Sequence, residues 1–241
     1  MSLFKVPILF AVMIHVWRAV TPPSRTPLPT TVDSKTKLQS GGMERYSRHV
    51  RYFLAFVHKL SACIPCILEM VLLIALYAPK SPLSHRIISA LTTRQSSPSD
   101  VRITPQFLIG AALVIGGSQL RSACYRALGN LFSFELVLFE EHKLVKTGPY
   151  AYIRHPSYLG MVCVNVGCLL LLFGRGSWCW ETAWPVGRIL LGISLPAWCA
   201  ILVDGLILRP VVEDRYLRER FGKEWDMWAK STPYRVIPFV Y

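Results

Sequence analysis

The residues best suited to chemistry lie in one short segment, residues 148–160, with the sequence GPYAYIRHPSYLG. Arg154 and His155 come directly before Pro156, which is typical of the first turn of a helix because that position needs no backbone donor. The backbone N–H groups of a first turn lack partners within the helix and can bind an anionic group such as a carboxylate. Arg154, His155 and the neighbouring tyrosines are each common at a membrane interface, but their combination in one segment indicates a binding site.

A second group of polar residues follows the last long apolar segment of the chain. Arg209 and Glu213 are four residues apart and therefore share one face of a helix. A structural salt bridge would explain this pair without any function. Asp214 adds a second carboxylate beside Glu213. We therefore expect a site with two parts, one around His155 and one around Arg209, at the same membrane depth.

The elements that must position these residues are predicted to be membrane-spanning helices. The chain has 241 residues, of which 52% are hydrophobic, and this is too apolar for an ordinary soluble domain. A spanning helix needs about 20 mostly apolar residues. Five segments qualify, and a sixth crossing is left open because the second segment is long and carries Lys59 and Glu69. The predicted fold class is therefore all-α, with helices over residues 3–20, 53–78, 103–120, 158–173 and 189–208.

The distribution of Lys and Arg predicts the orientation of these spans. The net charge of +13 does not lie in one stripe, as a nucleic-acid surface would require. With five spans, eighteen basic residues lie on one side and seven on the other, which favours a cytosolic C-terminus. From Pro210 onward, Val212 with Tyr216 and Leu217 with Phe221 pair at helical spacing, and charges occupy the other positions, which predicts a surface helix. Its Trp225 and Trp228 are expected to rest on the membrane.

Two regions are predicted along the chain. Residues 1–100 hold the N-terminal spans with a linker rich in Pro, Ser and Thr over residues 21–42, and residues 101–241 form the catalytic region. The seven cysteines are an odd number and lie mostly in apolar segments. This pattern predicts no disulfide framework, and no metal site is expected.

Two separated motifs resemble those of a known family. The first is H-x-L-V-x-x-G-P-Y-x-x-x-R-H-P-S-Y-x-G at residues 142–160, and the second is R-x-x-x-E-D-x-x-L-x-x-x-F-G-K-E-W at residues 209–225, before the ending RVIPFVY. Over roughly residues 100–241 the chain resembles the isoprenylcysteine carboxyl methyltransferases. It departs from their pattern at Asp214, where Glu is usual, and at Trp225, where Tyr is common.

The resemblance implies a function for each matching position. The reaction would be methyl transfer from S-adenosylmethionine to the C-terminal α-carboxylate of a prenylated cysteine, farnesyl or geranylgeranyl, in CaaX-processed proteins such as small GTPases or pheromones. The protein would lie in the endoplasmic reticulum membrane with its active site facing the cytosol, where a C-terminal helix completes the site. Arg209 would bind the acceptor and act with Glu213 in catalysis, and the cofactor pocket would comprise Glu135, His142, Lys143, Leu144, Val145, Tyr150, His155, Pro156, Ser157, Tyr158 and Glu213.

Three alternatives remain open at this point. A phospholipid N-methyltransferase has a similar G-P-x-x-x-x-R-H-P-x-Y-x-G segment, but its amine acceptor would gain nothing from Arg209. A membrane sterol reductase shares an Arg-His pair and a basic ending, but it would need a nicotinamide cofactor. An inactive scaffold with the same fold is the third, and the intact His155, Arg209 and Glu213 argue against it.

Overall fold

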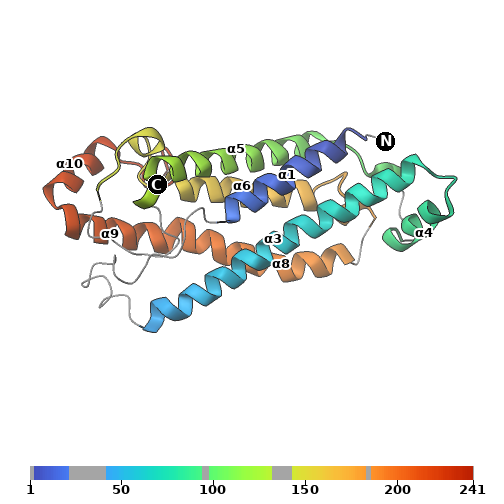
Figure 1. Cartoon of the computed structure of the whole chain (residues 1–241), viewed down its shortest axis with the longest axis horizontal. Helices are drawn as coiled ribbons and strands as arrows, with labels where there is room; N and C mark the ends of the chain where they lie inside the picture. Colours follow the sequence, from blue (N-terminus) through green and yellow to red (C-terminus); the bar gives the residue numbers. More distant parts are fainter. Residues whose placement is uncertain (1–2, 22–41, 94–97, 132–142, 183–185, 241) are drawn as a thin grey trace.

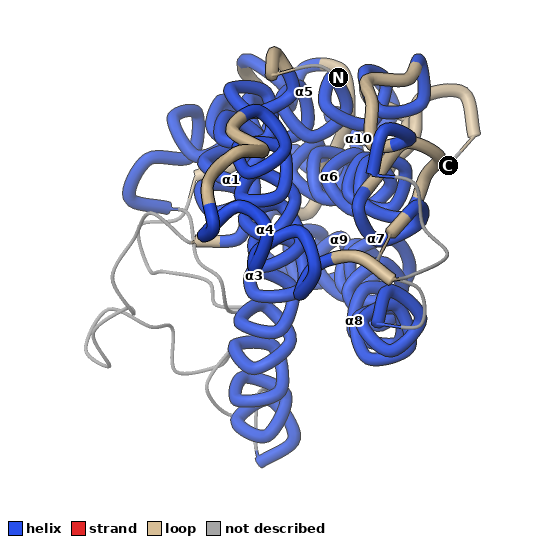
Figure 2. Tube along the Cα trace, turned by 90° about the vertical axis from the view of Figure 1, so that its right-hand side faces the viewer, coloured by secondary structure: helices blue, strands red, loops and turns tan. Residues whose placement is uncertain are grey.

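The computed structural model describes residues 3–21, 42–93, 98–131, 143–182 and 186–240, and these residues form helices and loops without any strand (Figure 2). The predicted all-α class is confirmed for these ranges. Most of the predicted linker, residues 22–41, lies outside them. The helices are α1 Lys5–Val20, α3 Gly42–Tyr77, α4 Pro82–Leu91, α5 Pro105–Leu128, α6 Pro156–Phe173, α7 Trp178–Glu181, α8 Val186–Val203, α9 Arg209–Phe221 and α10 Lys223–Ser231.

All five predicted apolar segments are helical. Within the described residues, four helices are long and apolar enough to cross a membrane: Tyr52–Tyr77, Pro105–Leu128, Pro156–Phe173 and Gly192–Phe221. The first predicted span, α1, has 16 residues. At 1.5 Å per residue it extends only about 24 Å, against about 30 Å for the hydrocarbon core of a bilayer.

Helices α5 and α6 make the most extensive contact among the described helices, because small residues face each other along their length. A Cβ atom added at Gly117 would lie 2.5 Å from the carbonyl oxygen of Gly160. One added at Gly110 would lie 2.8 Å from the carbonyl oxygen of Gly167. The two backbones therefore approach so closely that only glycine fits at these positions.

Lys59 and Glu69 of α3 each interact with a residue of α1, and α3 continues as one helix over 36 residues through Pro65. The Glu69 carboxylate forms an ion pair with the buried Lys5 of α1 and accepts a hydrogen bond of 2.9 Å from the backbone N–H of Trp178. The Lys59 ammonium lies 4.7 Å from the ring centre of Trp17. The second predicted span is therefore one uninterrupted helix, and the sixth crossing that was left open does not arise from a break in it.

The C-terminal region differs from the single surface helix predicted from Pro210. Helix α8 continues through a π-helical turn, Asp204–Leu208, directly into α9, with Pro210 in the first turn of α9 as expected. Helix α9 then ends at Gly222, which has a φ of +51°, and α10 begins at the next residue. The prediction that Trp225 and Trp228 rest on the membrane was wrong for Trp228, which is 5% exposed and packs inside the protein.

One end of the bundle gathers the elements of the predicted site. The C-terminal end of α5, the beginning of α6, both C-terminal helices and the chain's C-terminus lie together at the left of Figure 1. The N-terminus of the chain lies at the opposite end. The two sequence motifs are therefore neighbours in space.

Candidate functional site

His155 joins the two motifs. It is the N-cap residue of α6 and is buried, and its two ring nitrogens contact two adjacent carboxylates of α9. Its Nδ1 lies 3.1 Å from Glu213 Oε2, and its Nε2 lies 2.8 Å from Asp214 Oδ1. The Tyr158 hydroxyl, in the first turn of α6, donates a 2.5 Å hydrogen bond to the other Glu213 oxygen. The predicted proximity of the two segments is confirmed by these contacts.

The two carboxylates differ in their surroundings. The side chain of Asp214 is 7% exposed and also contacts Arg235 Nε at 2.9 Å and Arg154 Nε at 3.4 Å. The side chain of Glu213 is 28% exposed. Asp214 is therefore enclosed by cations that neutralise it, whereas Glu213 keeps an accessible side toward which a ligand can approach.

The carboxylates favour the imidazolium form of His155. Burial of the ring lowers its pKa, but the hydrogen bonds to Asp214 and Glu213, together with their negative charge, outweigh burial and raise the pKa of His155 above its ordinary value. An imidazolium ring donates from both nitrogens, which matches an acceptor on each side. His155 therefore serves as a fixed, doubly hydrogen-bonded link between α6 and α9.

Arg209 lies one helical turn before Glu213 and is 8% exposed. Its guanidinium interacts electrostatically with the Glu213 carboxylate and with the Tyr158 hydroxyl. A cation, an accessible carboxylate and a phenol therefore lie within one patch where α6 meets α9. A guanidinium in such a position can bind a carboxylate ligand.

The C-terminal residues 232–235 hold the first motif in place. The backbone N–H of Arg154 donates to the Tyr234 carbonyl at 3.0 Å, and that of His155 donates to the Arg235 carbonyl at 2.9 Å. The Tyr158 amide donates to the His155 carbonyl at 3.1 Å. These three amides are occupied, so the expected anion site on unpaired amides at the start of α6 cannot use them.

Tyr150 belongs to a small apolar cluster behind the site. It lies in a short 3-10 turn, Gly148–Ala151, and packs with Cys124 and Trp228. The indole Nε1–H of Trp228 donates to the Tyr150 carbonyl at 3.3 Å. Burial raises the pKa of the Tyr150 phenol well above its ordinary value, so the phenol stays neutral.

The remaining predicted residues lie in different surroundings. Leu144 and Val145 pack against the Tyr150 cluster, Pro156 is buried, and Lys143 is exposed. The hydroxyl and carbonyl of Ser157 face the guanidinium of Arg121. Glu135 and His142 lie outside the described residues.

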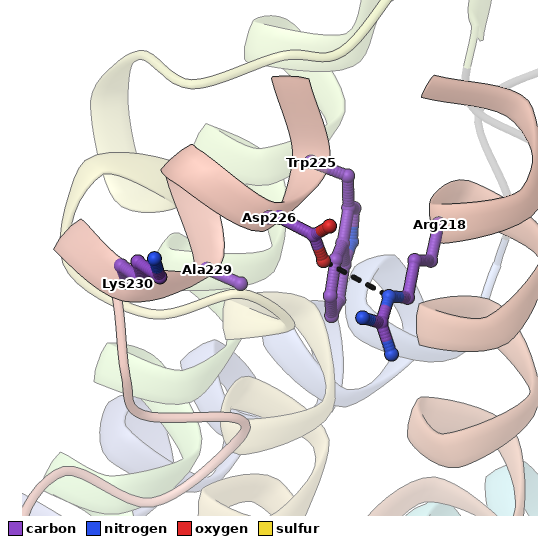
Figure 3. A pocket seen from close by; sticks show the side chains of 5 residues that line it. All are labelled: Arg218, Trp225, Asp226, Ala229 and Lys230. Atoms are coloured by element: carbon purple, nitrogen blue, oxygen red, sulfur yellow. Dashed lines mark ion pairs between the residues drawn. The ribbon is translucent and has the colours of Figure 1, made fainter. Parts of the chain in front are cut away.

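An open pocket lies between α9 and α10, and Trp225, one of its lining residues, packs against the cluster of Cys124, Tyr150 and Trp228 (Figure 3). Arg218 reaches from α9 to the Asp226 carboxylate of α10, with 2.9 Å between Nε and Oδ1. The Trp225 ring lies 5.8 Å from the Arg218 guanidinium and 5.9 Å from that of Arg154. The pocket contains none of the predicted site residues, which lie nearer to α6. Its lining residues are Arg218, Trp225, Asp226, Ala229 and Lys230.

Sequence reasoning noted Asp214 but gave it no role, and it gave none to Arg235 or Arg121. The signal for Asp214 was its position beside Glu213. The sequence does not show, however, which cationic side chains will surround its carboxylate in the folded protein. Arg235 lies in the ending RVIPFVY, which the motif comparison included as a whole. Arg121 follows directly after a predicted apolar segment and reads there as an ordinary interfacial cation.

Comparison with known proteins supports the motif analysis. Residues 109–185 match the family model described as the isoprenylcysteine carboxyl methyltransferase (ICMT) family. The chain is 33% identical over 135 residues to a protein-S-isoprenylcysteine O-methyltransferase of Saccharomyces cerevisiae, covering 55% of this chain and 49% of the yeast protein. It is 29% identical over 133 residues to protein-S-isoprenylcysteine O-methyltransferase B of Arabidopsis thaliana, covering 54% and 58%. The chain thus spans about half the length of these relatives.

Two further similarities are weaker. A Delta(14)-sterol reductase of Mus musculus is 24% identical over 99 residues, covering 41% of this chain and 20% of the reductase. A solved structure of the eukaryotic intramembrane Ras methyltransferase ICMT is 16% identical with a TM-score of 0.38, covering 96% of this chain and 92% of that one. The family model and the methyltransferase relatives confirm the predicted resemblance of this chain to the isoprenylcysteine carboxyl methyltransferase family.

Proposed function

We propose that this protein transfers a methyl group from S-adenosylmethionine to the C-terminal α-carboxylate of a prenylated cysteine, forming a methyl ester. The observation that carries the proposal is the contact of His155 with Glu213, 3.1 Å between Nδ1 and Oε2, because it unites the two motifs of the family pattern in one site. The names of the yeast and plant relatives support the same reaction.

The acceptor needs positioning rather than activation. A C-terminal carboxyl group has an ordinary pKa of about 3.3 to 3.7, so the nucleophile is already ionised near neutral pH and no general base is required. S-adenosylmethionine supplies an electrophilic methyl group on a sulfonium. The Arg209 guanidinium holds one oxygen of the acceptor carboxylate and leaves the other free for in-line attack, which is a gain from proximity and orientation.

Glu213 is the residue suited to the donor. Its side chain is 28% exposed, whereas that of Asp214 is 7% exposed and already paired with cations. A carboxylate with an accessible side fits an ammonium or ribose hydroxyl of the donor and complements the sulfonium charge. His155 and Tyr158 fix the Glu213 side chain through both of its oxygens. Asp214 does not contact the donor but holds the opposite side of the His155 ring.

The membrane supplies the acceptor. A prenyl chain enters laterally between helices, while its cysteine carboxylate reaches the end of the bundle that carries α9 and α10. We assign this end to the cytosol from the distribution of Lys and Arg, and the membrane to the endoplasmic reticulum. The acceptors are CaaX-processed proteins bearing farnesyl or geranylgeranyl groups.

A methylation assay in membranes containing the full chain tests the proposal. The acceptor is N-acetyl-S-farnesylcysteine, the donor carries a labelled methyl group, and base-labile methyl ester is the product measured. Membranes from cells without the chain are the control. Labelling of phosphatidylethanolamine with no labelled farnesylcysteine ester would reject the proposal in favour of the phospholipid N-methyltransferase. Binding of NADPH without binding of S-adenosylmethionine would favour the reductase.

A further inference from the structure

Arg121 lies near the end of α5, outside the group of residues described as the site. Its side chain is buried, and only 7% of the residue is exposed. All of its hydrogen bonds given by the structure go to neutral oxygens. They join Nε to the Ala19 carbonyl at 2.7 Å, one terminal nitrogen to the Ser157 carbonyl at 3.0 Å and the Ser157 hydroxyl at 3.2 Å, and the other to the Tyr125 hydroxyl at 2.6 Å.

These partners belong to three different helices. The Ala19 carbonyl is in the last turn of α1, where carbonyls lack partners within the helix and a nearby cation is favourable. The Tyr125 hydroxyl, from α5 itself, lies 3.3 Å from the same carbonyl. Ser157 is in the first turn of α6, two residues after His155. One guanidinium therefore connects the end of α1 to the beginning of α6.

The stem of Arg121 also fixes the spacing between α5 and α6. A Cβ atom added at Gly160 would lie 2.7 Å from the Cγ of Arg121. The beginning of α6 is thus in close contact with the Arg121 side chain at two places, Ser157 and Gly160. Because His155 is the N-cap residue of α6 and Tyr158 lies in its first turn, a shift of Arg121 would move both of the groups that hold Glu213.

We propose that Arg121 is a positioning residue for the reaction, and that α1 is a required part of the site rather than a separate anchor. Arg121 holds the first turn of α6 against the end of α1 and so keeps His155 and Tyr158 in contact with α9. It touches neither donor nor acceptor. The expected effect of Arg121 on the reaction rate rests on the proposed methyl transfer. Its role in joining α1 to α6 does not depend on that function.

The test compares Arg121→Met and Arg121→Lys with Arg126→Met, whose side chain is exposed on the same helix. A displacement of about 1 Å can reduce a rate by about a hundredfold. We expect Arg121→Met to lower kcat/KM for S-adenosylmethionine at least tenfold, with the KM for N-acetyl-S-farnesylcysteine changed less than threefold. Arg121→Lys, which keeps the charge and one donor group, should recover part of the loss. Arg126→Met should behave as the wild type.

Hydrogen exchange provides a readout that does not depend on activity. In Arg121→Met, amides of residues 155–160 and of the last turn of α1 should exchange at least tenfold faster, while those of α10 remain unchanged. Unchanged exchange at residues 155–160, or an equal rise throughout the protein, would overturn the positioning role. So would a failure of both Arg121 variants to accumulate while Arg126→Met does. Absence of methyl transfer in the wild type would reject the proposed function alone, because the exchange measurement still decides the role of Arg121.

Discussion

Replacing Asp214 by Asn should weaken the junction between α6 and α9 more than any exposed substitution in the same region. The Asp214 carboxylate accepts from His155 Nε2 at 2.8 Å and from Arg235 Nε at 2.9 Å, and it lies 3.4 Å from Arg154 Nε. Asparagine keeps the shape but removes the negative charge. Three cationic groups then lose their shared partner, and the imidazolium form of His155 loses part of its support.

The expected magnitude follows from burial. Breaking a buried ion pair by removing one partner costs about 3 to 5 kcal/mol. The His155 and Asp214 side chains are 4% and 7% exposed and fall in this class, whereas the Arg235 side chain is 27% exposed and adds less. We therefore take about 3 kcal/mol. For a chain of this size, at about 2 to 4 °C per kcal/mol, this corresponds to a fall in Tm of roughly 6 to 12 °C.

Asp226→Asn is the matched control. Asp226 also accepts from an arginine at 2.9 Å, but its side chain is 41% exposed and that of Arg218 is 65% exposed. Such a pair contributes at most about 1 kcal/mol. Thermal unfolding of the purified protein in one detergent, at one pH, measures both variants. Equal shifts in Tm for Asp214→Asn and Asp226→Asn would contradict this expectation, since they would show that the burial of Asp214 adds nothing to the strength of its ion pairs.

Three further predictions follow from individual contacts. Because the folded-state pKa of His155 is raised, its contribution to stability is present below about pH 6.5 and is lost as pH rises through the raised value. His155→Gln should therefore flatten the decline of wild-type Tm above pH 6.5, and an unchanged decline would contradict this. Gly117→Ala should cost about 3 kcal/mol by overpacking against α6, whereas Gly116→Ala, with open space around it, should not lower Tm. Trp228→Phe should lower Tm by removing the hydrogen bond to the Tyr150 carbonyl, an effect of about 1 kcal/mol that an unaltered Tm would exclude.

Much of the helical architecture could be predicted from the sequence because apolar length alone determines a spanning helix. The break at Gly222 was missed because the i, i+4 pairs before it, Val212 with Tyr216 and Leu217 with Phe221, suggested one continuous helix. The inward position of Trp228 was missed for a different reason. An amphipathic helix predicts that its apolar face is covered, but it does not tell whether lipid or protein covers it.

The site was predictable only where its residues form sequence motifs. His155, Tyr158 and Glu213 could be identified because their types and spacing form motifs, and the structure brings them into contact. Asp214 could not be assigned a role, because only tertiary packing decides which carboxylate faces two arginines and which keeps an accessible side. The role of Arg121 could not be predicted from the sequence either. Two of its four hydrogen-bond acceptors are backbone carbonyls, of Ala19 and Ser157, and their positions depend on where α1 ends and α6 begins.

Because Arg209 is proposed to hold the acceptor carboxylate, methyl ester formation by an Arg209 variant is the decisive measurement. The variant is Arg209→Met, and Arg215→Met is its control, because Arg215 lies on the same helix and its side chain is exposed. Each is assayed in membranes with N-acetyl-S-farnesylcysteine and labelled S-adenosylmethionine, at equal amounts of folded protein. We predict that Arg209→Met lowers kcat/KM for the farnesylcysteine by at least about a hundredfold, in line with the loss of orientation, while Arg215→Met retains wild-type activity. Wild-type ester formation by Arg209→Met would contradict the account.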